Sequence, residues 1–179
     1  MAQFGAQYPC FKPREAEAGV VLGKLVSANL TVTLATGELY ADDALAEQVS
    51  EFASGSIAME TDDITDDNAA VVYGANVSDG VVTYNKNDNA PEGVLGYFKV
   101  LVRGGAKSFK AYVYPRAKAA LGSDNAQTRG SSVTFTTVQT TFTVFADDKG
   151  DWRKTQEFAT AEEAKAWIGS ECAIASAGL

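Results

Sequence analysis

Residues 93–114 read GVLGYFKVLVRGGAKSFKAYVY, and this stretch decides the fold class. Two runs rich in β-branched and aromatic residues flank Gly104-Gly105, which is typical of a β-hairpin with a glycine turn. The second run alternates between two sets of side chains, which a strand places on opposite faces. The sets are Phe109, Ala111 and Val113 on one face and Lys110, Tyr112 and Tyr114 on the other.

Further strands are predicted on both sides of this hairpin, because apolar alternation at period two recurs there. They cover residues 30–36, 38–41, 56–60, 81–85 and 131–145, with a short strand around Trp152. Within 131–145 the apolar side chains move from odd positions, such as Val133, to even ones, such as Phe142. A strand changes its buried face only through a bulge, a bend or an interface at one end. One hypothesis is that this strand continues a sheet between subunits.

Two short helices are predicted from their N-terminal caps. Thr65 precedes a helix over 66–73 whose first turn is acidic, as the helix dipole favours. Thr160 and Glu163 have the spacing of a capping box, which opens a helix over 161–168.

These elements predict a mainly β (α+β) fold, a β-sandwich or barrel-like domain over residues 20–168 with one or two short flanking helices. Residues 1–19 hold aromatic side chains between glycine and proline residues, which predicts an extended arm docked on a neighbour through Phe4, Tyr8 and Phe11. Residues 169–179 are mostly small and are predicted to form a C-terminal tail. Residues 42–55 are predicted to form a long acidic loop.

Charge is sorted along the chain. Residues 25–85 contain eleven acids and no Lys or Arg, whereas residues 99–129 contain seven bases and one acid, within a net charge of −8. Acidic and basic segments of this kind can build two faces that attract each other between copies. The alternative interpretation is an uneven, solvated surface.

The composition argues against an enzyme. The chain has no histidine and two cysteines, Cys10 and Cys172, which are expected to be reduced thiols. The paired aspartates, such as Asp62-Asp63, fit turns and helix caps better than the spacing of a calcium loop. We therefore expect no catalytic residues, no metal and no cofactor. No apolar run is long enough to span a membrane, and the first residues predict no secretory signal.

The hairpin over 93–114 also mixes basic and aromatic side chains, as nucleic-acid-binding surfaces do. The sequence pI of about 4.5 opposes tight binding of DNA, because most of the surface would repel phosphates.

The order of four segments resembles the major tail proteins, or tail tube proteins, of long-tailed non-contractile bacteriophages. The segments are LYADD (39–43), VYG (72–74), the hairpin from GVLGYF (93–98) to YVYPRA (112–117), and TRGSSVTF (128–135) followed by FATAEEA (158–164) with Trp167. The resemblance implies a β-sandwich that assembles into hexameric rings, which stack head to tail into a tube that conducts DNA.

The resemblance and the charge pattern together predict the contact surfaces. The candidates for ring stacking or the lumen are Asp42, Asp43, Glu47, Glu51, Phe52, Glu60, Asp62 and Asp63. The complementary basic candidates are Lys99, Arg103, Lys107, Lys110, Arg116 and Lys118. The expected partners are other copies of the chain and other tail proteins such as the tape measure and terminator. DNA passes through without tight binding, and no membrane insertion is expected. The expected location is the virion tail, after assembly in the host cytoplasm.

Two other classes stay open at this point. One is another ring-forming virion or injection-machine protein, such as a terminator, a connector or the tube of a contractile system. The other is a monomeric β-sandwich that binds a ligand, with Trp152 and Trp167 as the platform.

Overall fold

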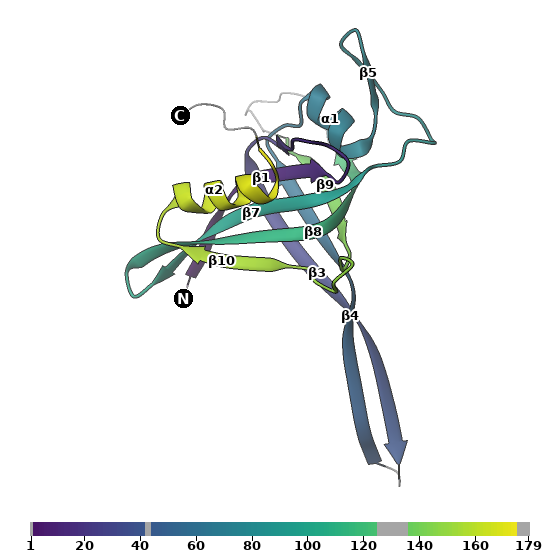
Figure 1. Cartoon of the computed structure of the whole chain (residues 1–179), viewed down its shortest axis with the longest axis vertical. Helices are drawn as coiled ribbons and strands as arrows, with labels where there is room; N and C mark the ends of the chain where they lie inside the picture. The colour runs from purple at the N-terminus through teal and green to yellow at the C-terminus, as the bar shows by residue number, and fades with distance from the viewer. Residues whose placement is uncertain (1, 42–43, 125–135, 175–179) are drawn as a thin grey trace, which may run out of the picture.

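One antiparallel sheet of eight strands dominates the structure (Figure 1), a computed structural model that describes residues 2–41, 44–124 and 136–174. The strands of this sheet are β1 (Ala2–Pro13), β2 (Val20–Val21), β3 (Leu25–Ala41), β4 (Ala44–Thr61), β7 (Glu92–Arg103), β8 (Ala106–Asp124), β9 (Val138–Val144) and β10 (Lys154–Phe158). The strands β5 (Asn76–Ser78) and β6 (Val81–Thr83) form a separate hairpin, and the helices are α1 (Asp66–Tyr73) and α2 (Ala161–Glu171). The predicted mainly β class is confirmed.

The sheet has the order β2-β1-β7-β8-β9-β4-β3, and β10 pairs with β8 off this path. The long strand β8 pairs with β10 along its first half and with β9 along its second half. Side chains from β1, β4, β7 and β9 meet in one core, and the rings of Phe11 and Phe142 lie 5.6 Å apart. Since β1 also contacts β3, the sheet curls around this core.

The predicted hairpin over 93–114 is confirmed as β7 and β8. Arg103 pairs with Ala106, and Gly104 and Gly105 have φ angles of 56° and 85°. Both angles lie in the left-handed region that glycine adopts without strain. The two predicted sets of side chains do face opposite ways, since Phe109, Ala111 and Val113 pack under α2 and Tyr112 and Tyr114 join the core inside the curled sheet.

Helix α2 covers the outer face of β7 and β8 (Figure 1), with Ala164 and Ile168 fully buried against them. The capping box of Thr160 and Glu163 is present. The helix continues three residues beyond the predicted end, to Glu171, because the backbone N–H of Cys172 still donates to the carbonyl of Ile168 at 2.8 Å. The predicted tail therefore begins as helix. Helix α1 has the predicted bounds, with Thr65 as its N-cap.

The prediction of an N-terminal arm over residues 1–19 is wrong for the described residues. β1 lies inside the sheet, hydrogen-bonded to β2 on one side and β7 on the other. Its register shifts on both sides of Gln7, and these irregularities accommodate Pro9 within the strand. The chain's own core covers two of the three aromatics that were expected to dock on a neighbour. Phe11 is fully buried and Tyr8 packs near α2, whereas Phe4 stays 53% exposed.

The prediction of a loop over residues 42–55 is also wrong. Residues 44–55 belong to β4, which pairs with β3 almost to the tip, up to the pair Ala41 and Ala44. Alanine, glutamate and glutamine have low β propensity, but the backbone ladder with β3 overrides it. Gly37 lies within β3 instead of interrupting it, since its partner across the ladder is Val49.

The described part of the predicted strand 131–145 is β9, and residues 131–135 lie outside the described residues. β9 pairs with β4 along one edge and β8 along the other. Because both edges are occupied, this segment cannot continue the sheet into a neighbour, and that hypothesis is wrong for it. A short strand was predicted to contain Trp152, but β10 begins two residues later, at Lys154, so Trp152 lies outside it.

We expect Gly93→Ala to destabilise the fold strongly, because β1 and β7 approach closely there. An added Cβ would clash with the Lys12 carbonyl and lie 2.8 Å from Phe11 Cζ. Overpacking of this kind costs about 1–3 kcal/mol or more. Gly37→Ala is the control, since a Cβ there meets nothing within 4 Å. Denaturant unfolding of both variants checks the expectation, and equal stabilities would contradict it.

Candidate assembly surfaces

The β3–β4 hairpin extends far beyond the rest of the sheet (Figure 1). β9 supports β4 only from Gly55, which pairs with Val144, to Thr61. Residues 33–41 of β3 and 44–54 of β4 form a two-stranded extension that we call the projecting ribbon. At about 3.3 Å per residue, its nine residues of β3 reach about 30 Å from the sheet.

Apolar side chains stand exposed on the projecting ribbon. Among the described residues, eleven large apolar side chains are exposed, and five of them lie on the ribbon. These five are Leu34, Leu39, Tyr40, Leu45 and Val49, and a sixth, Val32, lies at the base of the ribbon. An isolated two-stranded hairpin is marginally stable in water, and clustered exposed apolar side chains mark interaction sites. The ribbon therefore has the properties of a segment that another surface covers.

The acids of the ribbon divide between its two faces. Directly opposite residues share a face, so Glu51, Val49, Leu39 and Glu47 all lie on one face. This acidic-apolar face contains no base. On the other face, Glu38 accepts hydrogen bonds from Tyr40 Oη at 3.1 Å and Gln48 Nε2 at 3.3 Å. The predicted Asp42 and Asp43 lie outside the described residues.

The remaining acidic candidates have local structural roles. The hydroxyl of Ser27 donates to Glu60 at 3.0 Å. Asp62 accepts from the backbone N–H groups of Lys24 and Asp63, at 2.7 and 2.9 Å, and so fixes the turn after β4. The Asp63 side chain is exposed. Phe52 stacks on Trp152, with ring centroids 4.5 Å apart, and anchors the foot of the ribbon.

Three of the six basic candidates are held inside the subunit. Arg103 pairs with Glu157 at 3.1 Å, and Arg116 pairs with Glu92 at 2.8 Å. Lys118 donates to the side-chain carbonyl of Asn89 at 2.6 Å. These groups are therefore weak candidates for contacts between copies.

The other basic candidates are Lys99, Lys107 and Lys110, and Lys99 lines a groove at the foot of the ribbon. Lys99, Arg153, Tyr97 and Tyr112 define the basic groove, an open cavity of about 310 Å³ whose wall includes residues 28–30 of β3. Lys110 lies directly opposite Lys99 on β8, beside this cavity, with its Nζ 5.9 Å from the ring centroid of Tyr112. Lys107 is exposed near the β7–β8 turn.

Lysine and tyrosine are layered in the basic groove. Lys99 Nζ lies 5.7 Å from the ring centroid of Tyr97 and 5.5 Å from that of Tyr112. Burial and the nearby Arg153 both lower the pKa of Lys99. No ion pair of Lys99 or Arg153 with an acid is found within the described part of the chain. The groove thus holds cations whose charge is not balanced locally.

Arg153 is the residue of this groove that the sequence interpretation missed. It lies 39 positions after Tyr114, the end of the basic hairpin, and its only local signal is the adjacent Trp152, over which its guanidinium stacks at 4.7 Å. Arg153 directly precedes β10, and the pairing of Lys154 with Val113 on β8 places it at the groove. A pairing of that kind leaves no periodic pattern in the sequence.

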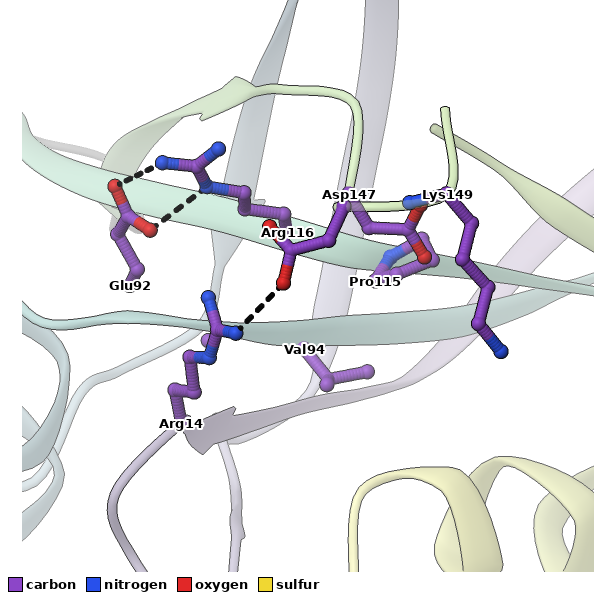
Figure 2. Close-up of a pocket in the computed structure, with 9 residues that line it drawn as sticks. Arg14, Glu92, Val94, Pro115, Arg116, Asp147 and Lys149 are labelled. Atoms are coloured by element: carbon purple, nitrogen blue, oxygen red, sulfur yellow. Dashed lines mark hydrogen bonds and ion pairs between the residues drawn. The ribbon is translucent and has the colours of Figure 1, made fainter. Parts of the chain in front are cut away.

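A second cavity, of about 230 Å³, lies at the start of β7 (Figure 2). Arg116 is ion-paired with Glu92 at 2.8 Å (Figure 2). Arg14 is ion-paired with Asp148 at 3.1 Å. Asp147 accepts from the backbone N–H groups of Lys149 and Asp151. Its four ion-paired side chains balance one another, so this cavity offers less to a charged ligand than the basic groove does.

The two tryptophans do not form a shared ligand platform. Trp152 packs against the core inside the sheet, between Phe52 and Arg153. Trp167 packs against Phe158 in the cluster under α2, with centroids 5.8 Å apart. The predicted binding platform is therefore absent from this part of the fold.

The described residues contain no group of three or more acids and cysteines placed to hold a metal ion. Neither described helix has the length and apolar character needed to cross a bilayer. Comparison of the sequence with protein-family models and with curated proteins gives no match.

We expect Glu92→Gln to lower stability at neutral pH and not in acid. The hydrogen bonds from Arg116 lower the pKa of Glu92, so this pair stabilises the fold above the unfolded pKa and the contribution is lost as pH falls through the folded value. The pair is about one-third exposed, which limits the effect to about 1 kcal/mol. Melting curves at several pH values test this, with the exposed Glu17→Gln as control. An equal loss at all pH values would contradict it.

We expect both thiols to resist labelling in the folded protein. Cys10 and Cys172 are fully buried, and burial raises both pKa values, that of Cys172 to about 12. The thiolate is the reactive form, so labelling requires unfolding. A colorimetric thiol assay with and without guanidinium checks this, and rapid labelling of the native chain would contradict it.

Proposed function

We propose that this chain is a structural subunit of a bacteriophage tail tube, whose copies form hexameric rings that stack head to tail around a conduit for the genome. The proposal combines the sequence resemblance with the surfaces described above. It assigns the chain no catalytic role.

The projecting ribbon is the observation that carries this proposal. A single soluble domain gains nothing from extending a ribbon of about 30 Å with five exposed apolar side chains, since each exposed group forgoes the gain from burial. A subunit that inserts the ribbon into a neighbour recovers that gain. A ribbon that fits a different surface of the next copy makes a heterologous contact, which extends without limit unless it is capped.

Strand β3 gives further support. It pairs with β4 along one edge, and in the described sheet it is the last strand of the path. An unpaired edge is a template for a strand from another chain. This edge, and not that of β9, is the place where a sheet could continue between subunits.

The acidic balance suits a conduit. A net charge of −8, with no base between residues 25 and 85, disfavours tight association with phosphates. We propose that some of these acids face the lumen, so that DNA slides past without binding. The tube would lie in the virion tail and contact the tape measure and terminator at its ends.

Shortening the ribbon tests the proposal. Leu34 and Phe52 lie directly opposite each other, so a two-residue Asn-Gly turn can replace residues 35–51 and close the hairpin. We expect the full-length chain to form rings or tubes by negative-stain electron microscopy, and the shortened chain to stay as single copies with an intact fold by circular dichroism.

Gly37→Ala, which keeps the whole ribbon, is the matched control and is expected to assemble. Concentrated full-length chain that remains as single copies contradicts the proposal, as does a shortened chain that still forms tubes. Assembly that stops at one closed ring would favour a terminator over a tube subunit.

A further inference from the structure

Lys99 of the basic groove lies in a charge arrangement that is unfavourable in an isolated subunit. Lys99 and Lys110 are direct cross-strand partners, and like charges at such positions are destabilising. Arg153 adds a third cation at the same place. Glu157 lies opposite Lys110 on β10, but its carboxylate is held by Arg103 and Ser108, at 3.1 and 2.6 Å. An added anion would relieve the repulsion between Lys99 and Arg153.

The acidic-apolar face of the projecting ribbon has the complementary chemistry. Glu47 and Glu51 flank Leu39 and Val49 on it, and all four side chains are exposed. No hydrogen bond or ion pair of either glutamate is found in the described part of the subunit. The walls of the groove supply tyrosine rings and Leu30 for the aliphatic side chains.

We propose that the basic groove of one copy holds the carboxylates of Glu47 and Glu51 from the projecting ribbon of a second copy, with Lys99 and Arg153 as their ion-pair partners. This inference rests on the proposed function, because it names the seat of the ribbon that assembly requires.

The placement of the two surfaces gives the contact a direction, because the ribbon and the groove lie at different places on each copy. The groove includes Asn29 at the foot of the ribbon, and Glu47 pairs with Leu39, ten residues farther along β3. At about 3.3 Å per residue the two ends of the contact lie about 33 Å apart within one copy. Such a separation prevents a copy from filling its own groove, and it makes each contact advance the assembly by a similar distance.

A nucleic-acid strand is the competing occupant, because tyrosines and cations also suit stacked bases and phosphates. The ribbon is favoured because a protein with this net negative charge repels nucleic acid. The ribbon also contains no Lys or Arg that would repel the cations of the groove. The test includes both occupants.

Two altered chains that cannot polymerise test the inference. The first is the shortened chain, which keeps the groove and lacks the ribbon. The second is Lys99→Glu/Arg153→Glu, which keeps the ribbon, and in which the carboxylate introduced at position 99 would face Lys110 favourably. Mixed together, they are expected to form a one-to-one complex by sedimentation velocity, while neither grows alone.

The controls isolate the groove. Shortened chain that also carries Lys99→Glu/Arg153→Glu is expected to bind the ribbon donor at least about tenfold more weakly, since the reversal places like charges opposite the ribbon's glutamates. Shortened chain with Lys86→Glu/Lys165→Glu has the same charge change at two exposed lysines outside the candidate surfaces and is expected to bind normally. Circular dichroism confirms that each chain is folded.

The outcomes separate the two proposals. If the full-length chain forms tubes but the two altered chains form no one-to-one complex, the groove assignment is wrong and the tube proposal stands. The same holds if the complex forms equally well with the reversed groove. Full-length chain that stays as single copies removes both. If a labelled single-stranded oligonucleotide binds the shortened chain and groove reversal abolishes only that binding, the groove is a nucleic-acid site and the inference is wrong.

Discussion

The pairing of β7 with β8 is the interaction on which the rest of this structure depends. Because side chains alternate along a strand, this one hairpin presents two unlike faces. Its outer face of Phe98, Ala111 and Val113 seats α2, and its inner face supplies the tyrosines of the core. The same alternation carries Lys99 and Lys110 to the open end of the inner face, where the core gives way to the groove. The register of the β7–β8 pair therefore determines both the packing of the core and the chemistry of the groove.

The ribbon depends on a second, weaker constraint. The hairpin below it is fixed by β9, and its foot is fixed by Phe52 on Trp152, whereas the rest of the ribbon is held by the β3–β4 ladder alone. A ladder without a packed face adds little stability, so a change in the ribbon's shape has little effect on the stability of the fold. Its exposed side chains are consequently free to suit a partner instead of the core.

Local signals in the sequence were sufficient where a residue's neighbours in the chain decide its structure. The cap at Thr65, the capping box at Thr160 and the glycine turn at residues 104 and 105 are all of this kind, and all were predicted. The signals failed where distant pairing decides. The 44–55 segment has poor β propensity and became a strand only through β3, and β1 contains Pro9 but is held between two neighbours. The candidate site shows the same division, since Lys99 and Lys110 could be predicted and Arg153 could not.

The unpaired edge of β3 has a consequence for the newly made chain. Before it assembles with other copies, each copy exposes both an unpaired strand edge and hydrophobic side chains. This combination promotes amorphous aggregation. Glutamates spaced along the ribbon act as gatekeepers against that fate, because identical ribbons laid side by side would stack like charges. The acids would thus slow aggregation between ribbons and still allow binding to an oppositely charged surface. This difference favours ordered addition of newly made subunits at the growing end of an assembly.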